Sequence, residues 1–329
     1  MTRTTPPRPV DVTALFPGLR AYAKTATRLH PRPGRPGVTD SSVGGPLLWP
    51  AGEPWPMCTD GRHDTETPQY LHDVRRWREL LAAAWARTPR GEQLRITDEE
   101  RAALPDLDVA APQQLTREPI AMIPVAQLYR RDVPGLPGPE GTDLLQVLWC
   151  PLDHEDLEYC PRVHLRWRRA GAVTEVLAAP PQPLVVHDDY LPEPCVLHPE
   201  QVREFPYVDL LPGDLAERVC AWDDGLYSFA LSIADGWKVG GHADWSLNDP
   251  RPMDCEQCGA AMRLLLCAAG AEWDHETFSW RPVEDAGEPA YSSLHPASGP
   301  TGVVIGRGYS LWIFTCPVSY SHPHRTAMQ

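Results

Sequence analysis

The stretch Val43-Gly44-Gly45-Pro46-Leu47-Leu48-Trp49-Pro50 decides how the fold of this sequence is interpreted, because its opening returns as Val239-Gly240-Gly241, again followed by a tryptophan. Other short motifs recur in the same order. In the first half they are Trp49, Pro56-Met57-Cys58, Ala121-Met122-Ile123 and Leu145-Gln146-Val147-Leu148-Trp149-Cys150-Pro151. In the second half they are Trp245, Pro252-Met253-Asp254-Cys255, Ala261-Met262-Arg263-Leu264 and Leu311-Trp312-Ile313-Phe314-Thr315-Cys316-Pro317. Self-similarity in a fixed order indicates two divergent copies of one module.

The two copies differ mainly by an insertion. The first copy carries residues 60–118 after Cys58, whereas the second passes almost directly from Cys255 to Ala261. Long additions inside compact domains are usually functional or disordered, so the insertion is a candidate lid or binding appendage. The predicted organisation is an N-terminal helical, Pro-rich segment (1–42), the first copy with its helical insertion (43–160), connecting strands with a short helix (161–237), the second copy (238–317) and a tail (318–329).

Proline accounts for 38 of 329 residues and interrupts long helices, so strands and turns are expected to form most of the chain. We therefore predict an α+β fold that is predominantly β. Helices are predicted at 68–88, 97–105, 214–222 and, interrupted, at 14–27. Strands are predicted at 143–149, 163–167, 173–177, 226–233, 262–266, 303–305 and 311–315. Each Gly-Gly pair is expected to provide a positive φ or a close backbone approach.

The charge balance limits the partners that this chain can bind. The formal net charge is -14, which repels phosphate backbones and anionic lipid headgroups, so neither nucleic acid nor membrane is an expected partner. The polar N-terminus lacks the apolar run of a signal peptide, and no long apolar stretch follows. These features predict a cytoplasmic protein with reduced cysteines.

Cys255 and Cys258 have the two-residue spacing of zinc ligands, and a tetrahedral zinc needs two more. Cys316, which closes the same copy, is the candidate third ligand, and His322 or His324 the fourth. Such a thiolate-rich site would hold one structural Zn²⁺ and leave no open position for catalysis. The alternative is a pair of reduced cysteines at a β-turn.

The first copy contains a looser set, made of Cys58, His63, His72, Cys150, His154 and Cys160. Their spacing is unlike that of known metal motifs, so we interpret these cysteines as buried packing residues rather than ligands.

At the Gly-Gly and Cys-x-x-Cys-Gly motifs, and at Pro124-Val125-Ala126-Gln127-Leu128, the sequence resembles the YwqG-like family, a bacterial domain of unknown function. It is more distantly similar to the eukaryotic programmed-cell-death-protein-2 group. The resemblance covers roughly residues 28–317 and implies a duplicated β-rich fold without established catalysis. Members of the eukaryotic group act as chaperones for a ribosomal protein, and some bacterial relatives lie beside toxin genes. In related zinc-bearing members a further cysteine follows Cys316, whereas here Pro317-Val318-Ser319-Tyr320 intervenes.

We expect a non-enzymatic protein-binding module, chaperone- or adaptor-like, with a protein partner whose basic character would suit the negative charge. Trp49, Trp55 and Trp245 are candidate binding residues, and core packing is the alternative. Trp49 and Trp55 lie beside prolines, and tryptophan with proline forms rigid, partly wet surfaces suited to peptides. Two other functions remain open. One is an immunity protein against a cationic toxin, and the other is an enzyme whose site lies under the 60–118 insertion, with His63 or His72 facing Cys58.

Overall fold

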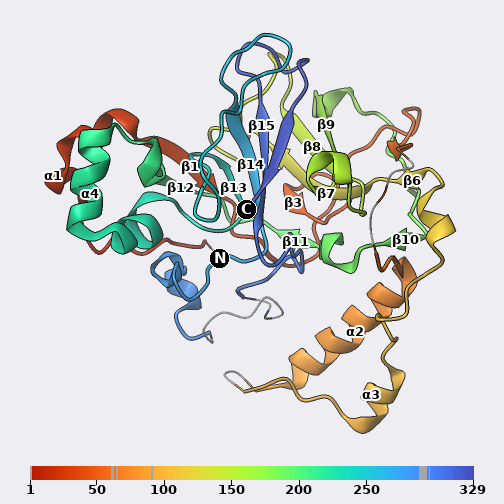
Figure 1. Ribbon diagram of the computed structural model, residues 1–329. Coiled ribbons are helices and arrows are strands. Elements are labelled where there is room, and N and C mark those ends of the chain that lie inside the picture. The colour runs from red at the N-terminus through yellow and green to blue at the C-terminus, as the bar shows by residue number, and fades with distance from the viewer. Residues whose placement is uncertain (1, 61–62, 64–65, 90–91, 289–294, 296) are drawn as a thin grey trace.

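The structure is a computed structural model that describes residues 2–60, 63, 66–89, 92–288, 295 and 297–329 (Figure 1). Helices of all kinds make up 24% of the chain and strands 23%. The predicted mixture of helices and strands is confirmed, but strands do not predominate. The reason is that many connections between strands wind into short 3₁₀-helices.

One six-stranded sheet, called the first sheet, is antiparallel throughout. Its strands in spatial order are β2 (Arg32–Pro33), β11 (Cys195–Val196), β3 (Ser42–Val43), β7 (Ile123–Tyr129), β8 (Leu144–Trp149) and β9 (Val163–Arg168). Every residue of β8 is buried, and this explains its nearly unbroken apolar sequence.

A second six-stranded sheet is also antiparallel and has a matching order. Its strands are β12 (Glu200–Glu204), β1 (Lys24–Arg28), β13 (Lys238–Gly240), β14 (Arg263–Ala269), β15 (Ser310–Thr315) and β16 (Arg325–Met328). One cluster of buried apolar side chains includes Val125 and Val147 of the first sheet together with Leu265 and Ile313 of the second. The two sheets therefore share a core.

The central hairpins of the two sheets have the same register. In the first sheet Ile123 pairs with Trp149 and the ladder skips Val125; in the second Arg263 pairs with Thr315 and the ladder skips Leu265. Each skip is a β-bulge two residues into the strand. A glycine with positive φ marks the end of the strand before each hairpin, as expected from the Gly-Gly motifs: Gly44, with φ 64°, directly follows β3, and Gly240, with φ 71°, is the last residue of β13.

Two chain segments pass from one sheet to the other. Residues 24–33 supply β1 to the second sheet and β2 to the first, while residues 195–204 supply β11 to the first sheet and β12 to the second. The two segments keep a single antiparallel register, from Lys24 opposite Glu204 to Pro33 opposite Cys195. The same pair of segments thus joins both sheets.

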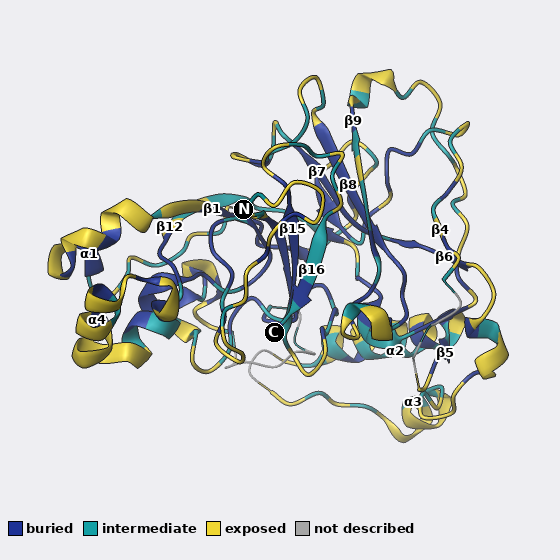
Figure 2. Ribbon diagram, turned by 45° about the horizontal axis from the view of Figure 1, so that its top comes forward, coloured by how far each residue is buried: buried dark blue, intermediate teal, exposed yellow. Residues whose placement is uncertain are grey.

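Helices lie at opposite ends of the molecule (Figure 1). At one end α1 (Val12–Leu15) and η1 (Pro17–Tyr22) pack against α4 (Gly213–Leu226) and the π-helix η7 (Tyr227–Ser232). At the other end the insertion forms α2 (Leu71–Arg87) and α3 (Asp98–Ala103). Helix α3 has no buried residue, as the colouring of Figure 2 shows.

Two short ladders connect the insertion to the sheets. They are β4 (Met57–Cys58) with β6 (Ile120–Ala121), and β5 (Gln69–Tyr70) with β10 (Val185–Val186). The remaining 3₁₀-helices are η2 (Gln113–Thr116), η3 (Glu155–Leu157), η4 (Ala170–Ala172), η5 (Asp188–Tyr190), η6 (Val208–Leu210), η8 (Phe278–Trp280) and η9 (Val283–Asp285). Among the described residues, no helix has both the length and the apolar character needed to cross a membrane.

Several predicted elements differ from those observed. The apolar run at 226–233 is helical rather than extended, because a short apolar run suits a buried helix as well as a strand. At 173–177 and 303–305 only isolated bridges form, at Val176 and Ile305. The predicted interrupted helix at 14–27 ends early and gives way to β1, and the predicted tail at 318–329 contains β16.

Candidate metal centres and an acidic cavity

The four predicted metal ligands of the second half come together, and we call them the second cluster: Cys255, Cys258, Cys316 and His322. One ligand atom from each lies within 4.8 Å of all the others. The Cys255 sulfur is 3.5 Å from His322 Nδ1, and the Cys258 and Cys316 sulfurs are 3.5 Å apart. Such a cluster can hold a metal ion. The alternative fourth ligand, His324, is not a member of the cluster.

The first half contains another four-residue cluster, which we call the first cluster: Cys58, His63, Cys150 and His154. His63 Nε2 lies 3.4 Å from the Cys58 sulfur and 3.3 Å from the Cys150 sulfur, and His154 Nε2 lies 3.7 Å from Cys58. The interpretation of these residues as packing alone was therefore wrong about their geometry. These four side chains can also hold a metal ion.

Three ligand-to-ligand distances in the first cluster and two in the second fit a tetrahedral zinc. With Zn–S bonds of about 2.3 Å and Zn–N bonds of about 2.0–2.1 Å, neighbouring ligand atoms are about 3.3–3.8 Å apart. The five sulfur–nitrogen and sulfur–sulfur distances above range from 3.3 to 3.7 Å. Each cluster offers four such donors and so would fill the coordination shell, as in structural rather than catalytic zinc sites.

Backbone N–H groups support the cysteine sulfurs in both clusters. Four of the cysteines have a backbone N–H group two residues later that acts to lower the pKa of the thiol: that of Asp60 for Cys58, Leu152 for Cys150, Ala260 for Cys258 and Val318 for Cys316. Donation to sulfur favours the thiolate, which is the form that binds metal. The local chain conformation after each cysteine therefore suits a metal ligand.

Two of the cysteines have strongly lowered pKa values. Interactions with the Cys150 thiol, first of all, and with the His154 and His63 imidazoles lower the pKa of Cys58 to about 2, whereas burial raises the pKa of Cys150. Burial also tends to raise the pKa of Cys316, but the N–H groups of Ser319 and Val318 outweigh it and lower this pKa to about 6. Each cluster thus contains a cysteine that favours the thiolate at neutral pH.

The two clusters occupy corresponding positions in their sheets. Cys58 lies in β4, which pairs with β6, and Cys255 follows the matching bridge between Asp254 and Ala261. Cys150 directly follows β8, and Cys316 directly follows β15. The recurring sequence motifs align Cys58 with Cys255 and Cys150 with Cys316, so this signal could have identified the two cysteines of the first cluster, though not its two histidines. His72 and Cys160 belong to neither cluster, and the His72 side chain is 73% exposed.

The three tryptophans predicted to bind a partner are core residues. Trp49 is 1% exposed, Trp55 8% and Trp245 5%. Trp49 packs against Trp55, and Trp245 packs against Trp312. The prolines beside Trp49 and Trp55 do not keep these side chains out of the interior, so the predicted surface role of the three tryptophans is corrected in favour of packing.

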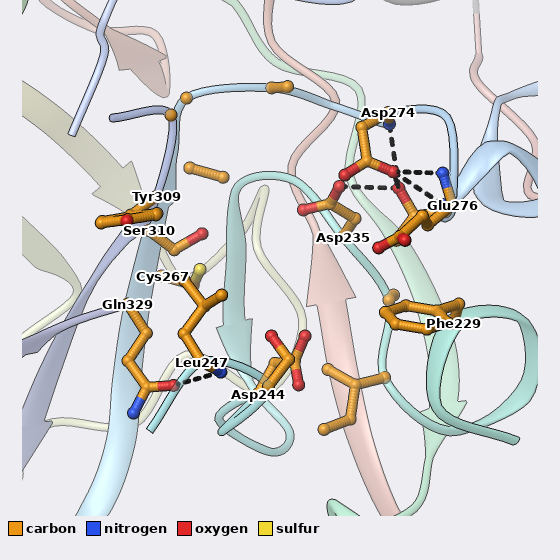
Figure 3. Close-up of a pocket in the computed structure, with 18 of the residues that line it drawn as sticks. Phe229, Asp235, Asp244, Leu247, Cys267, Asp274, Glu276, Tyr309, Ser310 and Gln329 are labelled. Carbon is orange, nitrogen blue, oxygen red and sulfur yellow. Dashed lines mark hydrogen bonds between the residues drawn. The ribbon is translucent and has the colours of Figure 1, made fainter. Parts of the chain in front are cut away.

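A cavity of about 340 Å³ opens beside η7 and the ends of β14 and β15 (Figure 3). Its lining carries two basic side chains, Lys238 and Arg307, and four carboxylates, those of Asp235, Asp244, Asp274 and Glu276. Burial raises the pKa of Asp235 and of Asp244 to about 6. The Lys238 ammonium is paired with Glu204 at 2.7 Å, so the cavity is negative at neutral pH.

Comparison with family models and curated proteins identifies no relative of this chain. No protein-family model matches it, and a search of curated proteins finds no match. Its function must therefore be inferred from the sequence and from the geometry of the clusters and the cavity.

Proposed function

We propose that this chain is a non-enzymatic protein-binding module made of two copies of one β-rich unit, stabilised by structural zinc and binding a basic partner. The resemblance to the YwqG-like family is part of this proposal. The observation that carries it is the acidic cavity, where carboxylates outnumber basic side chains four to two. A lysine or arginine side chain entering the cavity would meet partly desolvated carboxylates, which attract a cation more strongly than exposed ones do.

The matching registers support the two-copy part of the proposal. Strand order, bulge position and the site of the cysteine after the second hairpin strand all correspond between the sheets. The closed sets of four sulfur and nitrogen donors support a structural metal. A catalytic zinc keeps one coordination position open for water or substrate, and neither cluster offers that arrangement when all four side chains bind.

Binding of short peptides tests the partner chemistry. Calorimetry would compare a lysine-rich peptide with the same peptide acetylated on its lysines, at low and moderate salt. We expect only the unmodified peptide to bind, and Asp244→Asn to weaken it about tenfold through loss of one charge interaction. Asp108→Asn removes the same charge from an exposed position outside the cavity and serves as the matched control. Equal binding of both peptides, or equal weakening by both variants, would contradict the proposal.

Metal analysis tests the zinc part separately. Untagged protein purified without chelator should contain zinc, and chelation should lower its melting temperature because binding stabilises only the folded form. Cys258→Ser should remove the ion of the second cluster. Protein that is free of zinc, fails to take it up on titration and melts unchanged with chelator would contradict this part.

A further inference from the structure

The two ends of the helical insertion meet at the first cluster. Cys58 is the last residue of β4, directly before the insertion, and His63 lies within its first residues. His63 Nδ1 lies 2.5 Å from the carbonyl oxygen of Thr116, in the last turn before β6. Since a carbonyl can only accept, Nδ1 carries the proton and Nε2 presents its lone pair to the sulfurs of Cys58 and Cys150. This is the tautomer that metal-bound histidines adopt, with the second nitrogen fixed by a backbone oxygen.

His154 adds a second observation. Its side chain is wholly buried, and among the described residues its Nδ1 has no hydrogen-bond partner. Its Nε2 points to Cys58 at 3.7 Å, too long for a strong hydrogen bond. A buried imidazole with so few partners is costly, and a metal ion bound at Nε2 would compensate for that cost.

Charge and burial also agree. Two thiolates and two neutral imidazoles around Zn²⁺ form a centre without net charge, and the first cluster is buried at Cys58, Cys150 and His154. Three thiolates and one imidazole leave a charge of minus one, and the second cluster is partly exposed, at Cys258 and His322. The first cluster, which would be neutral with zinc bound, is thus the more buried of the two, and burial is where an uncompensated charge would be unfavourable.

We propose that Cys58, His63, Cys150 and His154 bind a second Zn²⁺ that fastens both ends of the helical insertion to the end of β8. On binding, the Cys58 and Cys150 thiols release any protons they hold to solvent, and two Zn–S and two Zn–N bonds form without a change in oxidation state. His63 and, through its hydrogen bond, Thr116 connect the start and the end of the insertion to this ion. The inference goes beyond the binding role proposed above and does not depend on it.

The effect of losing this ion should be local. Helix α2 is held separately by Arg78, which donates to the carbonyl oxygens of Asp188 at 2.6 Å and Gly302 at 3.1 Å and pairs with Glu193 at 3.0 Å. Without the ion, the chain at His63 and at residues 112–119 should open more often, while α2 keeps its contacts. The ion therefore controls the attachment of the insertion rather than its folding.

Metal content and hydrogen exchange, followed by mass spectrometry, test this proposal on the full chain. We expect two zinc ions per chain, and one after either His63→Ala or Cys258→Ser. Backbone exchange in peptides covering 59–68 and 112–119 should be about tenfold faster in His63→Ala and unchanged in Cys258→Ser. His72→Ala, an exposed histidine of the same insertion, should leave metal content and exchange unchanged.

Cobalt titration gives a check that does not depend on variants. Co²⁺ bound by four ligands should show two binding events whose sulfur-to-metal absorption differs, because the clusters contain two and three thiolates.

The metal content of the variants decides between one site and two. One ion per chain that is lost in Cys258→Ser but kept in His63→Ala would overturn the site at the first cluster and leave the predicted zinc of the second cluster intact. If the wild type binds two ions and His63→Ala loses one of them without any change in backbone hydrogen exchange, the site would stand but its role in fastening the insertion would be overturned.

Discussion

At the scale of single residues, the carboxylate of Glu204 explains why the second Gly-Gly pair is required. Glu204 is wholly buried and accepts from Lys238 Nζ at 2.7 Å and from the backbone N–H groups of His242 at 2.8 Å and Ala234 at 3.0 Å. Gly241 leaves the room for this carboxylate, because a Cβ there would lie 2.2 Å from Glu204 Oε2. The ion pair therefore depends on a residue that contributes no side chain.

Gly241→Ala should destabilise the protein strongly. The φ of 75° would cost about 1 kcal/mol for alanine, and displacement of the buried carboxylate from its partners would add about 2 kcal/mol or more. Gly141 has the same φ of 75° and nothing within 4 Å of an added Cβ, so Gly141→Ala should show only the smaller cost. Urea unfolding of both variants separates the two effects, and equal losses would refute a special role for Gly241.

A pH effect follows from Asp235. Burial, with a smaller contribution from Asp274, raises its pKa from 3.8 to about 6, so the proton is held more tightly in the folded state. Its contribution to stability is thus complete below pH 4 and is lost as the pH rises through about 6. Asp235→Asn should be neutral near pH 4 and more stable than the wild type by about 2 kcal/mol at pH 8. Denaturant unfolding at both pH values tests this, and a variant less stable at pH 8 than at pH 4, relative to wild type, would contradict it.

At the scale of elements, a buried polar network fixes the segment around Leu48 and Trp49 on the first sheet. Gln146 Nε2 donates to the Leu48 carbonyl at 3.0 Å and to Gln127 Oε1 at 2.8 Å, while Gln127 Oε1 also accepts from the Leu48 N–H at 2.7 Å. Arg168 Nε donates to Gln146 Oε1 at 2.7 Å and its guanidinium lies over the Trp49 ring. Side chains from β7, β8 and β9 thus hold the segment at Leu48 and Trp49, which itself forms no strand of the first sheet.

Gln146→Leu keeps the volume but removes this network. It leaves the Leu48 carbonyl and Arg168 Nε without their partner in a buried region, which should cost about 2–3 kcal/mol. Gln114→Leu is the matched control, since Gln114 is exposed, and should change the unfolding free energy by less than about 0.5 kcal/mol. Thermal or denaturant unfolding measures both, and equal stability of the two variants would show that the network contributes nothing.

Whether a strand could be predicted from the sequence depended on its length and on how apolar it is. Strands β8 and β15 were predicted because they are continuous apolar runs, whereas β7, whose sequence includes Pro124 and Gln127, was missed. Strand β1, rich in polar and basic residues, was missed because its place in the sheet comes from β12 and β13, which lie far along the chain. Strand β16 pairs with the nearby β15 but is only four residues long and has no apolar run of its own. The second cluster was predicted from Cys255 and Cys258, whose spacing is local. In the first cluster no two ligands have a familiar spacing, and only the pairing of β4 with β6 and of β7 with β8 brings them together.

At the scale of the whole molecule, the two sheets are joined where residues 24–33 and 195–204 cross between them, and buried charges gather at this junction. Arg28, in β1, donates to the carbonyl oxygens of Trp280 at 2.8 Å and Glu272 at 3.3 Å. His30 Nδ1 lies 3.0 Å from the Glu272 carboxylate, and Arg32, in β2, pairs with Glu272 at 3.5 Å and with Asp285. Glu272 therefore links the crossing segment to the loop after β14, and removing its carboxylate should destabilise both sheets.

Glu272→Gln should lower the unfolding free energy by about 3 kcal/mol at pH 7, because it removes the buried carboxylate that His30 and Arg32 share and leaves them only Glu200 and Asp285, respectively. Burial tends to raise the pKa of Glu272, but His30, Arg32 and Arg28 outweigh it and lower the pKa to about 2. The stabilisation is therefore present above pH 4.5 and is lost as the pH falls toward 2, so the difference from wild type should shrink by about 2 kcal/mol at pH 3. Glu158→Gln, which breaks the exposed pair with Arg251, should cost less than about 1 kcal/mol at either pH.

Unfolding followed by tryptophan fluorescence and circular dichroism should remain a single coincident transition, because both sheets depend on the same junction. Two separated transitions in the wild type, or a loss in Glu272→Gln that does not change with pH, would show that the sheets are stabilised independently of this carboxylate.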